Sequence, residues 1–123
     1  MAEVREVNRG SVYYVDLPKE KVFYQSCEQG ERPCVVVSSN IGCKTSDIVM
    51  VCPITGKIKE HSCNVNVTWT ANGKQCQVLC NQIITVPKSS LVRYKGYINN
   101  MEMREVNKAI MISLGITGGV IIC

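Results

Sequence analysis

Short apolar runs that are separated by proline, glycine or asparagine recur along most of the sequence. This pattern restricts the folds that the chain can adopt. The runs are rich in β-branched residues and have the length of single strands. They cover residues 11–17, 34–38, 47–52, 64–68, 77–86 and 91–98. Turn-forming residues at 39–42 and 71–74 separate neighbouring runs. Several short strands at such close spacing predict a small antiparallel β-barrel.

Towards its C-terminal end the sequence changes to a helical period. Apolar side chains recur there at steps of three and four residues, at Met103, Val106, Ile110 and Leu114. This spacing predicts one amphipathic helix over 99–114, capped by Asn99 or Asn100 and ended by Gly115. The predicted fold class is therefore mainly β with one C-terminal helix, an α+β fold.

Composition and charge narrow the class of protein further. With 123 residues, 46% of them hydrophobic, the chain can form one domain over 1–123 with a packed core. No apolar run approaches the roughly 20 residues that span a bilayer, and the charged start lacks the apolar region of a secretory signal. We therefore expect a cytoplasmic protein with no membrane partner. A net charge of +4 permits a nucleic-acid partner, although the lack of a dense basic tract argues against indiscriminate duplex binding.

The chain has eight cysteines, which could indicate metal sites or disulfides. None of them forms a Cys-x-x-Cys pair and His61 is the only histidine, so a zinc site with close ligand pairs is not expected. Several cysteines lie inside apolar runs, where a reduced thiol behaves as a small hydrophobic side chain. We expect reduced, structural thiols and no metal or cofactor. Cys27 is the exception, because it lies in a polar segment before Arg32.

Arg32 lies between a glycine turn and a proline, just before a valine-rich run. Pro33 fixes its own φ and removes one backbone donor, so Arg32 is expected at the start of a strand and not at its centre. A guanidinium there can bind a phosphate or a carboxylate with its planar fork of donors. A solvated loop arginine is the alternative interpretation of the same pattern.

Four segments and a closing helix, in order along nearly the whole chain, resemble the MazF/PemK family of toxins, which are mRNA endoribonucleases of toxin–antitoxin pairs. The four segments are 9–17 (RGSVYYVDL), 28–37 (EQGERPCVVV), 49–55 (VMVCPIT) and 79–86 (LCNQIITV), and the closing helix is 106–115 (VNKAIMISLG). The resemblance implies a homodimer with an SH3-like barrel of the CcdB/PemK-like kind. It also implies three partners: single-stranded mRNA as substrate, a cognate antitoxin protein, and operator DNA only through the antitoxin complex.

The resemblance also implies roles for particular residues. It makes Arg32 and Thr55 catalytic, and it makes Glu28 and Gln29 groups that shape the active loop. We place Ser26 with them as a substrate-binding residue.

Three departures from the family pattern concern base specificity more than chemistry. Ser11 stands where the family often has aspartate. The stretch that leads to Pro33 is one residue shorter than the commonest spacing, and the segment 18–25 has its own sequence.

These residues suit a cleavage in which the 2′-hydroxyl of the RNA attacks the neighbouring phosphate, leaving 2′,3′-cyclic phosphate and 5′-hydroxyl ends. The sequence has neither a carboxylate cluster at motif spacing nor a histidine pair, and His61 is expected on the surface. Arg32 is expected to act chiefly as an electrostatic clamp, since a guanidinium is a poor base at neutral pH. Thr55 is expected to donate its hydroxyl to the same phosphate. A threonine bonded to backbone at a strand end is the alternative.

Lysines near Thr55 are candidates for contacting RNA. Lys57 and Lys59, together with Lys44, could line a groove for the phosphates of a single strand, and a solvated basic loop is the alternative. The polar segments 18–31 and 54–62 are expected to read unpaired bases. An acidic, partly disordered segment of the antitoxin is expected in the same groove.

Two other functions fit the same predicted fold. A non-enzymatic toxin similar to the CcdB family would inhibit DNA gyrase, and a generic barrel would bind a protein partner through a degenerate site. The combination of Arg32 and Thr55 favours the endoribonuclease over both.

Overall fold

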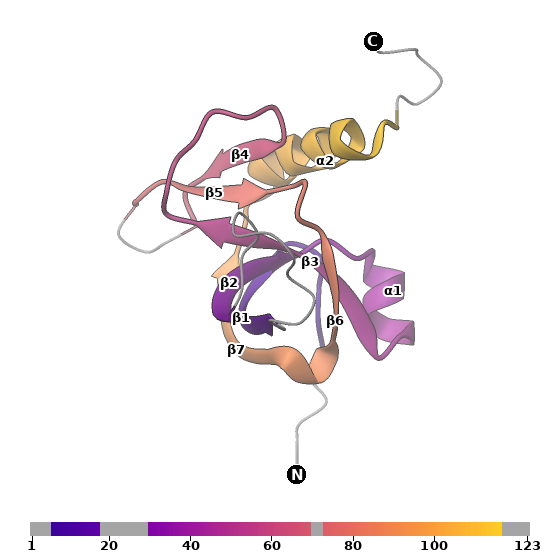
Figure 1. Cartoon of the computed structure of the whole chain (residues 1–123). Coiled ribbons are helices and arrows are strands. Elements are labelled where there is room, and N and C mark those ends of the chain that lie inside the picture. Colours follow the sequence, from indigo (N-terminus) through magenta and orange to yellow (C-terminus); the bar gives the residue numbers. More distant parts are fainter. Residues whose placement is uncertain (1–5, 18–29, 70–72, 117–123) are drawn as a thin grey trace.

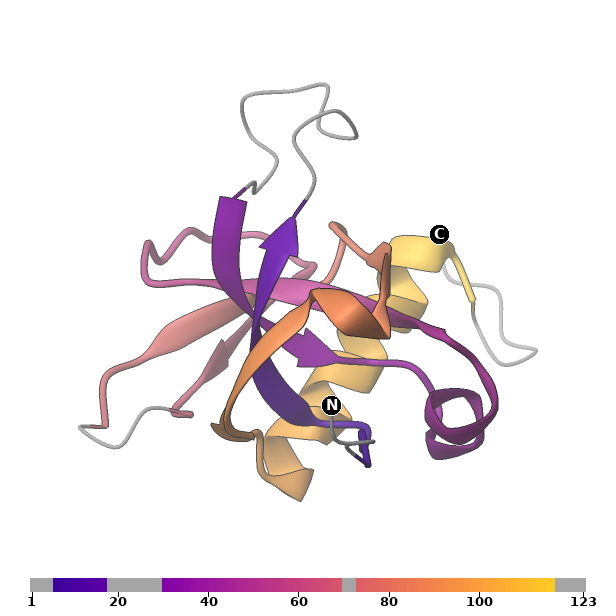
Figure 2. The same ribbon diagram turned by 90° about the horizontal axis from the view of Figure 1, so that it is seen from below.

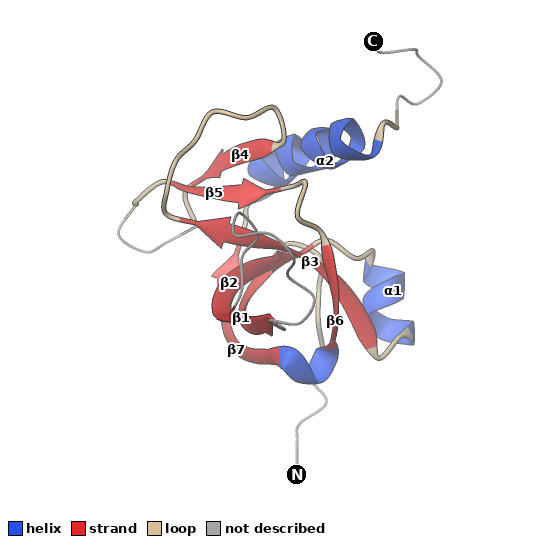
Figure 3. Cartoon of the chain, viewed as in Figure 1, coloured by secondary structure: helices blue, strands red, loops and turns tan. Residues whose placement is uncertain are grey.

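The computed structural model describes residues 6–17, 30–69 and 73–116, which form a β-sheet with one long helix (Figure 1, Figure 3). Its elements in chain order are β1 Ser11–Leu17, β2 Gly30–Val36, α1 Asn40–Thr45, β3 Ile48–Thr55, β4 Asn64–Val67, β5 Cys76–Leu79, β6 Ile84–Pro87, the 3₁₀ turn η2 Lys88–Ser90, β7 Leu91–Tyr97 and α2 Asn100–Leu114.

All neighbouring strands of the sheet run antiparallel, in the order β4-β5-β3-β2-β1-β7, and β6 pairs with β3 beside this path. β3 has different partners along its length, because residues 48–51 pair with β6 whereas Ile54 and Thr55 pair with β5. The prediction of a mainly β fold with a C-terminal helix is confirmed. The curved sheet is not closed by hydrogen bonds, since β6 and β7 are joined through η2 and no described residues pair them.

Two clusters of buried side chains lie on opposite faces of the strands, because alternate residues of a strand point to opposite sides. One cluster lies under α2 and includes Val12 and Val35. The other includes Tyr13, Val15, Cys34 and Val51. In Figure 2, α2 (orange to yellow) passes behind the indigo and purple strands, and its buried residues Met103, Val106 and Ala109 belong to the first cluster.

The C-terminal helix has the predicted bounds and caps. The Asn99 side chain accepts a hydrogen bond from the Glu102 amide at 2.8 Å, which satisfies one of the free donors of the first turn. Gly115 ends the helix with a φ of 71°, in the left-handed region where glycine carries no steric penalty. The Glu102 carboxylate also accepts from the backbone amide of Thr68 at 2.9 Å, and so ties the end of β4 to the helix.

α1 was not predicted, because the sequence pattern indicates only a turn at 39–42. Ser39 begins the helix by accepting a hydrogen bond from the Gly42 amide, and only Cys43 of its residues is buried. Six residues are too few for an apolar helical period to show in the sequence.

Pro53 does not end its strand, contrary to the sequence interpretation. β3 continues through it to Thr55, so these last residues are strand and not loop. Proline is tolerated in a strand where one side has no ladder bond to lose. Pro53 meets this condition because the β6 pairing ends at Val51 and the β5 pairing begins at Ile54.

The six described cysteines are buried free thiols, which confirms the structural role expected for them. They are Cys34, Cys43, Cys52, Cys63, Cys76 and Cys80. The Cys52 thiol donates a hydrogen bond to Cys80, and this bond together with burial raises the pKa of Cys52, so this thiol stays protonated. Cys27 lies outside the described residues. None of the helices in the described part of the chain has the length and apolar character needed to cross a membrane.

Candidate active site

The two predicted catalytic residues lie on the neighbouring strands β2 and β3, just beyond the end of the ladder that joins these strands. The last pair of this ladder is Cys34 opposite Pro53. Arg32 on β2 and Thr55 on β3 each lie two residues beyond this pair, outside the ladder, at the positions where the same register would place them opposite each other if it continued. Successive side chains of a strand point to alternate faces of the sheet. The side chains of Arg32 and Thr55 therefore lie on the same face as those of Cys34 and Val51.

Arg32 lies inside β2 and not at its start, which corrects the sequence expectation. The strand begins at Gly30, whose φ of 80° lies in the left-handed region, and Arg32 pairs with Val15 of β1. Pro33 fits within the strand because the ladder to β3 begins only at Cys34. Arg32 is exposed at this position.

Thr55 is half-buried at the end of β3, opposite Gln77 of β5. Its Oγ1 accepts a hydrogen bond from the backbone amide of Lys57 at 3.2 Å. The alternative interpretation of Thr55 was a strand-end threonine bonded to backbone, and this hydrogen bond is of that kind. It occupies only one lone pair of the hydroxyl oxygen. The hydroxyl hydrogen remains able to donate to a phosphate oxygen.

A buried polar network holds the loop that follows Thr55. Gln77 is only 4% exposed, and its Oε1 accepts from the Lys59 amide at 2.9 Å. Its Nε2 donates to the Lys59 carbonyl at 2.8 Å and to Asn66 Oδ1 at 2.9 Å. Asn64 Nδ2 donates to the same carbonyl at 3.3 Å. Gln77 and Thr55 therefore lie side by side under one loop.

Sequence analysis did not identify this network. Its trace in the sequence is a glutamine within an apolar run, Gln77, together with asparagines at alternate positions 64 and 66 of another run. These residues share a face once the strands pair, because Asn66 is opposite Gln77. Their common target, the backbone of Lys59, has no signature in the sequence.

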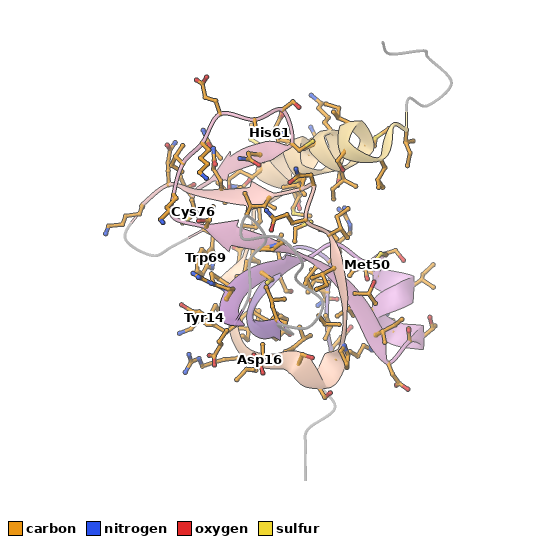
Figure 4. The ribbon with its side chains drawn as sticks, viewed as in Figure 1. Tyr14, Asp16, Met50, His61, Trp69 and Cys76 are labelled. Atoms are coloured by element: carbon orange, nitrogen blue, oxygen red, sulfur yellow. The ribbon has the colours of Figure 1, made fainter. Side chains whose placement is uncertain are left out.

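The three predicted lysines do not lie together. Lys57 and Lys59 are exposed in the loop after Thr55. Lys44 is exposed on α1, which precedes the other end of β3. The eight residues of β3 span roughly 23 Å. Figure 4 shows the same separation, with Met50 near the α1 end of the strand and Cys76 of β5 on the opposite side of the molecule.

The remaining predicted residues divide into two groups. Ser26, Glu28 and Gln29 lie outside the described residues. His61 is exposed, as predicted, and its Nδ1 accepts a hydrogen bond from the Cys63 amide at 3.1 Å. Figure 4 places it beside β4 and α2. Within residues 6–17, 30–69 and 73–116, no three His, Cys, Asp or Glu side chains gather as a possible metal site.

A second group of cations, which sequence analysis did not single out, lies beside Tyr14 on the neighbouring strand β7. The guanidinium of Arg93 lies 5.1 Å and the ammonium of Lys95 lies 5.5 Å from the centre of the Tyr14 ring. Arg93 also forms an ion pair with Glu31 at 3.6 Å, next to Arg32 in the chain. Both partners are about half exposed, so this pair contributes little to stability.

Comparisons with known proteins identify the family of this chain. Residues 8–114 match the family described as PemK-like, MazF-like toxin of type II toxin–antitoxin systems. The chain is 36% identical over 115 residues to "Endoribonuclease MazF" of Staphylococcus saprophyticus, covering 89% of this chain and 92% of that protein.

Solved structures show the same fold at lower identity. An endoribonuclease in complex with its cognate antitoxin from Mycobacterial species superposes with a TM-score of 0.75 at 23% identity, over 90% of this chain and 97% of that one. MazF from Deinococcus radiodurans gives a TM-score of 0.75 at 17% identity, over 90% and 98% of the two chains. Sequence and fold agree, and the chain belongs to the PemK-like, MazF-like family of type II toxin–antitoxin toxins.

Proposed function

We propose that this toxin is an endoribonuclease that cleaves single-stranded mRNA at specific sequences without a metal ion. The proposal is supported by the placement of Arg32 and Thr55 on neighbouring strands, each two residues beyond the last pair of the β2–β3 ladder, beside a loop with two exposed lysines. The 36% identity to a curated endoribonuclease over most of the chain supports the same activity.

In the proposed reaction the substrate supplies its own nucleophile. The 2′-hydroxyl attacks the adjacent phosphorus, the bond to the 5′ oxygen breaks, and the products carry a 2′,3′-cyclic phosphate and a 5′-hydroxyl. The Arg32 guanidinium binds the nonbridging oxygens and stabilises the charge that develops on them. It also protonates the leaving 5′ oxygen, and Thr55 donates its hydroxyl to the same phosphate. A guanidinium is too weak a base at neutral pH to take the 2′-hydroxyl proton, so this proton passes to solvent water, and solvent returns a proton to Arg32 after the 5′ oxygen has left.

The RNA strand would lie across the end of β3 and the loop that follows it. Lys57 and Lys59 contact its phosphates near the cleaved bond. Lys44 meets the same strand only several nucleotides away, because it lies at the other end of β3. Ser26, Glu28 and Gln29, from the segment before β2, complete the binding surface and select the bases.

Two protein partners belong to this proposal. A cognate antitoxin would place an acidic segment over Arg32 and the lysines, excluding RNA, and operator DNA would be bound only through that complex. A second copy of the toxin would cover the exposed apolar side chains at the α1 end of β3, which are Ile41, Ile48 and Met50. Because the substrate is mRNA, the toxin would act in the cytoplasm.

Incubation of a long mixed-sequence transcript with the purified protein and EDTA tests the function. We expect cleavage at one short motif, mapped by primer extension, with cyclic phosphate and 5′-hydroxyl ends. Cleavage that EDTA abolishes would contradict the metal-free mechanism. An intact transcript together with inhibited DNA gyrase would support the CcdB-like alternative and overturn the proposal.

A further inference from the structure

The loop beside Thr55 rests on a side chain that is unusual for its position. Gln77 is 4% exposed and stands between Cys76 and Val78, which point to the apolar cluster on the opposite face. A buried amide is costly unless its donors and acceptor are satisfied. Here both donors and the acceptor of the Gln77 carboxamide have hydrogen-bond partners. Two of these hydrogen bonds are to the backbone amide and carbonyl of Lys59 in the loop.

The segment from Gly56 to Ser62 is therefore attached near its start by hydrogen bonds from two strand residues. Thr55 Oγ1 accepts from the Lys57 amide, and Gln77 pairs with both backbone groups of Lys59. Asn66 and Asn64 orient the network, since Asn66 accepts from Gln77 Nε2 and Asn64 donates to the Lys59 carbonyl. The loop backbone is fixed at 57 and 59, which are the residues that carry the two lysine side chains.

We propose that Gln77 is a positioning residue for RNA binding, which holds Lys59 and its neighbour Lys57 at a fixed distance from Thr55. This inference rests on the proposed function. Gln77 itself touches no substrate and acts only through the loop. Phosphate contacts of the lysines stabilise bound RNA and the transition state alike. Loss of the hydrogen bonds between Gln77 and Lys59 therefore weakens RNA binding more than it slows the chemical step.

Replacement of Gln77 by leucine tests this positioning role, because leucine has a similar volume but pairs with neither backbone group of Lys59. We expect KM for a short RNA carrying the cleavage motif to rise about tenfold, with kcat within about twofold of wild type. Gln75, an exposed glutamine two residues before Gln77, provides the matched control. Gln75→Leu should change neither constant. An unchanged KM in a folded Gln77→Leu protein would overturn the inference.

A double-mutant cycle separates positioning from a general loss of stability. If Gln77 acts through the lysines, Gln77→Leu should add no further loss of RNA affinity to the Lys57→Ala, Lys59→Ala double variant. The affinity is measured with an RNA whose 2′-hydroxyl at the cleavage site is replaced by hydrogen. Full additivity of the two losses would show that the glutamine acts elsewhere.

Amide hydrogen exchange provides a readout that does not require activity. The Lys59 amide should exchange slowly in the wild type and at least about tenfold faster in Gln77→Leu, because its acceptor is removed. If Gln77→Leu does not fold, Asn64→Ala, which loses the Nδ2 bonds to the Lys59 carbonyl and to Gln77 Oε1 but keeps Gln77 itself, should also raise KM, by a smaller factor. Slow exchange of the Lys59 amide in a wild-type protein that does not cleave RNA would refute the proposed function but not the hydrogen bonding by Gln77. Fast exchange of the Lys59 amide in a wild-type protein that cleaves RNA normally would refute only the role of Gln77.

Discussion

The two ends of β3 are held in different ways. At its first end the strand pairs with β6 and β2, and Val49 and Val51 are buried among apolar side chains. At its last end it pairs with β5, and Thr55 and the following loop are fixed by side-chain hydrogen bonds to backbone. Apolar burial has no direction, whereas these hydrogen bonds set particular atoms at particular distances.

This contrast indicates how stability and activity divide along one strand. Substitutions at the first end remove buried apolar volume, and we expect them to lower the free energy of unfolding while each folded molecule remains active. Substitutions at the last end remove groups that bind or position RNA, and we expect them to lower activity while the fold remains intact. Three variants test this division, in order of expected effect.

Arg32→Ala should give the largest effect, a loss of cleavage rate of about 10²- to 10³-fold, because the phosphate loses its main charged donor. The side chain is exposed, so the free energy of unfolding should change by less than about 1 kcal/mol. Single-turnover cleavage and thermal unfolding measure the two quantities. Arg104→Ala, an exposed arginine on α2, is the control and should be active. Wild-type cleavage by Arg32→Ala would show that this arginine is not catalytic.

Val51→Ala should have the reverse profile. It removes two methyl-sized groups from a residue with no exposed surface and leaves a cavity, which costs about 2 to 3 kcal/mol of stability. For a domain of this size that corresponds to a melting temperature lower by about 10 °C. At a temperature where both proteins are folded, the cleavage rate should match wild type. A marked loss of rate without a loss of stability would show that the two ends of β3 are not independent.

Asn99→Ala should give the smallest effect, a loss of about 1 kcal/mol of stability, because the first turn of α2 loses its side-chain cap. The helix covers the face of the sheet opposite Arg32 and Thr55, so the cleavage rate should not change. Asn100→Ala, one residue later and exposed, is the matched control. Equal melting temperatures for both variants would indicate that the cap is not needed.

Much of the fold could be predicted because it depends on local patterns. The valine-rich and alternating runs predict β1, β4 and β7 closely, and the apolar spacing predicts α2 together with its asparagine cap and terminal glycine. The effects of Pro33 and Pro53 could not be predicted, since whether a proline breaks a strand depends on which side of it has a partner. That information lies in the pairing of strands distant in sequence.

The candidate site could be predicted only in part for the same reason. Catalytic roles for Arg32 and Thr55 were predicted through a family resemblance, and their placement on neighbouring strands depends on a strand pairing that no single segment encodes. The separation of Lys44 from Lys57 and Lys59 depends on the length and direction of β3. The Gln77 network joins a loop to two strands by three side chains, so it becomes visible only in three dimensions.

The most direct test of the central claim is a crystal structure of the toxin bound to an RNA that lacks the 2′-hydroxyl at the cleavage site. The account predicts that the Arg32 guanidinium and the Thr55 hydroxyl both lie within about 3 Å of oxygens of the same phosphate, the one that would be cleaved. A scissile phosphate held by other side chains, with Arg32 and Thr55 both free of it, would contradict the account.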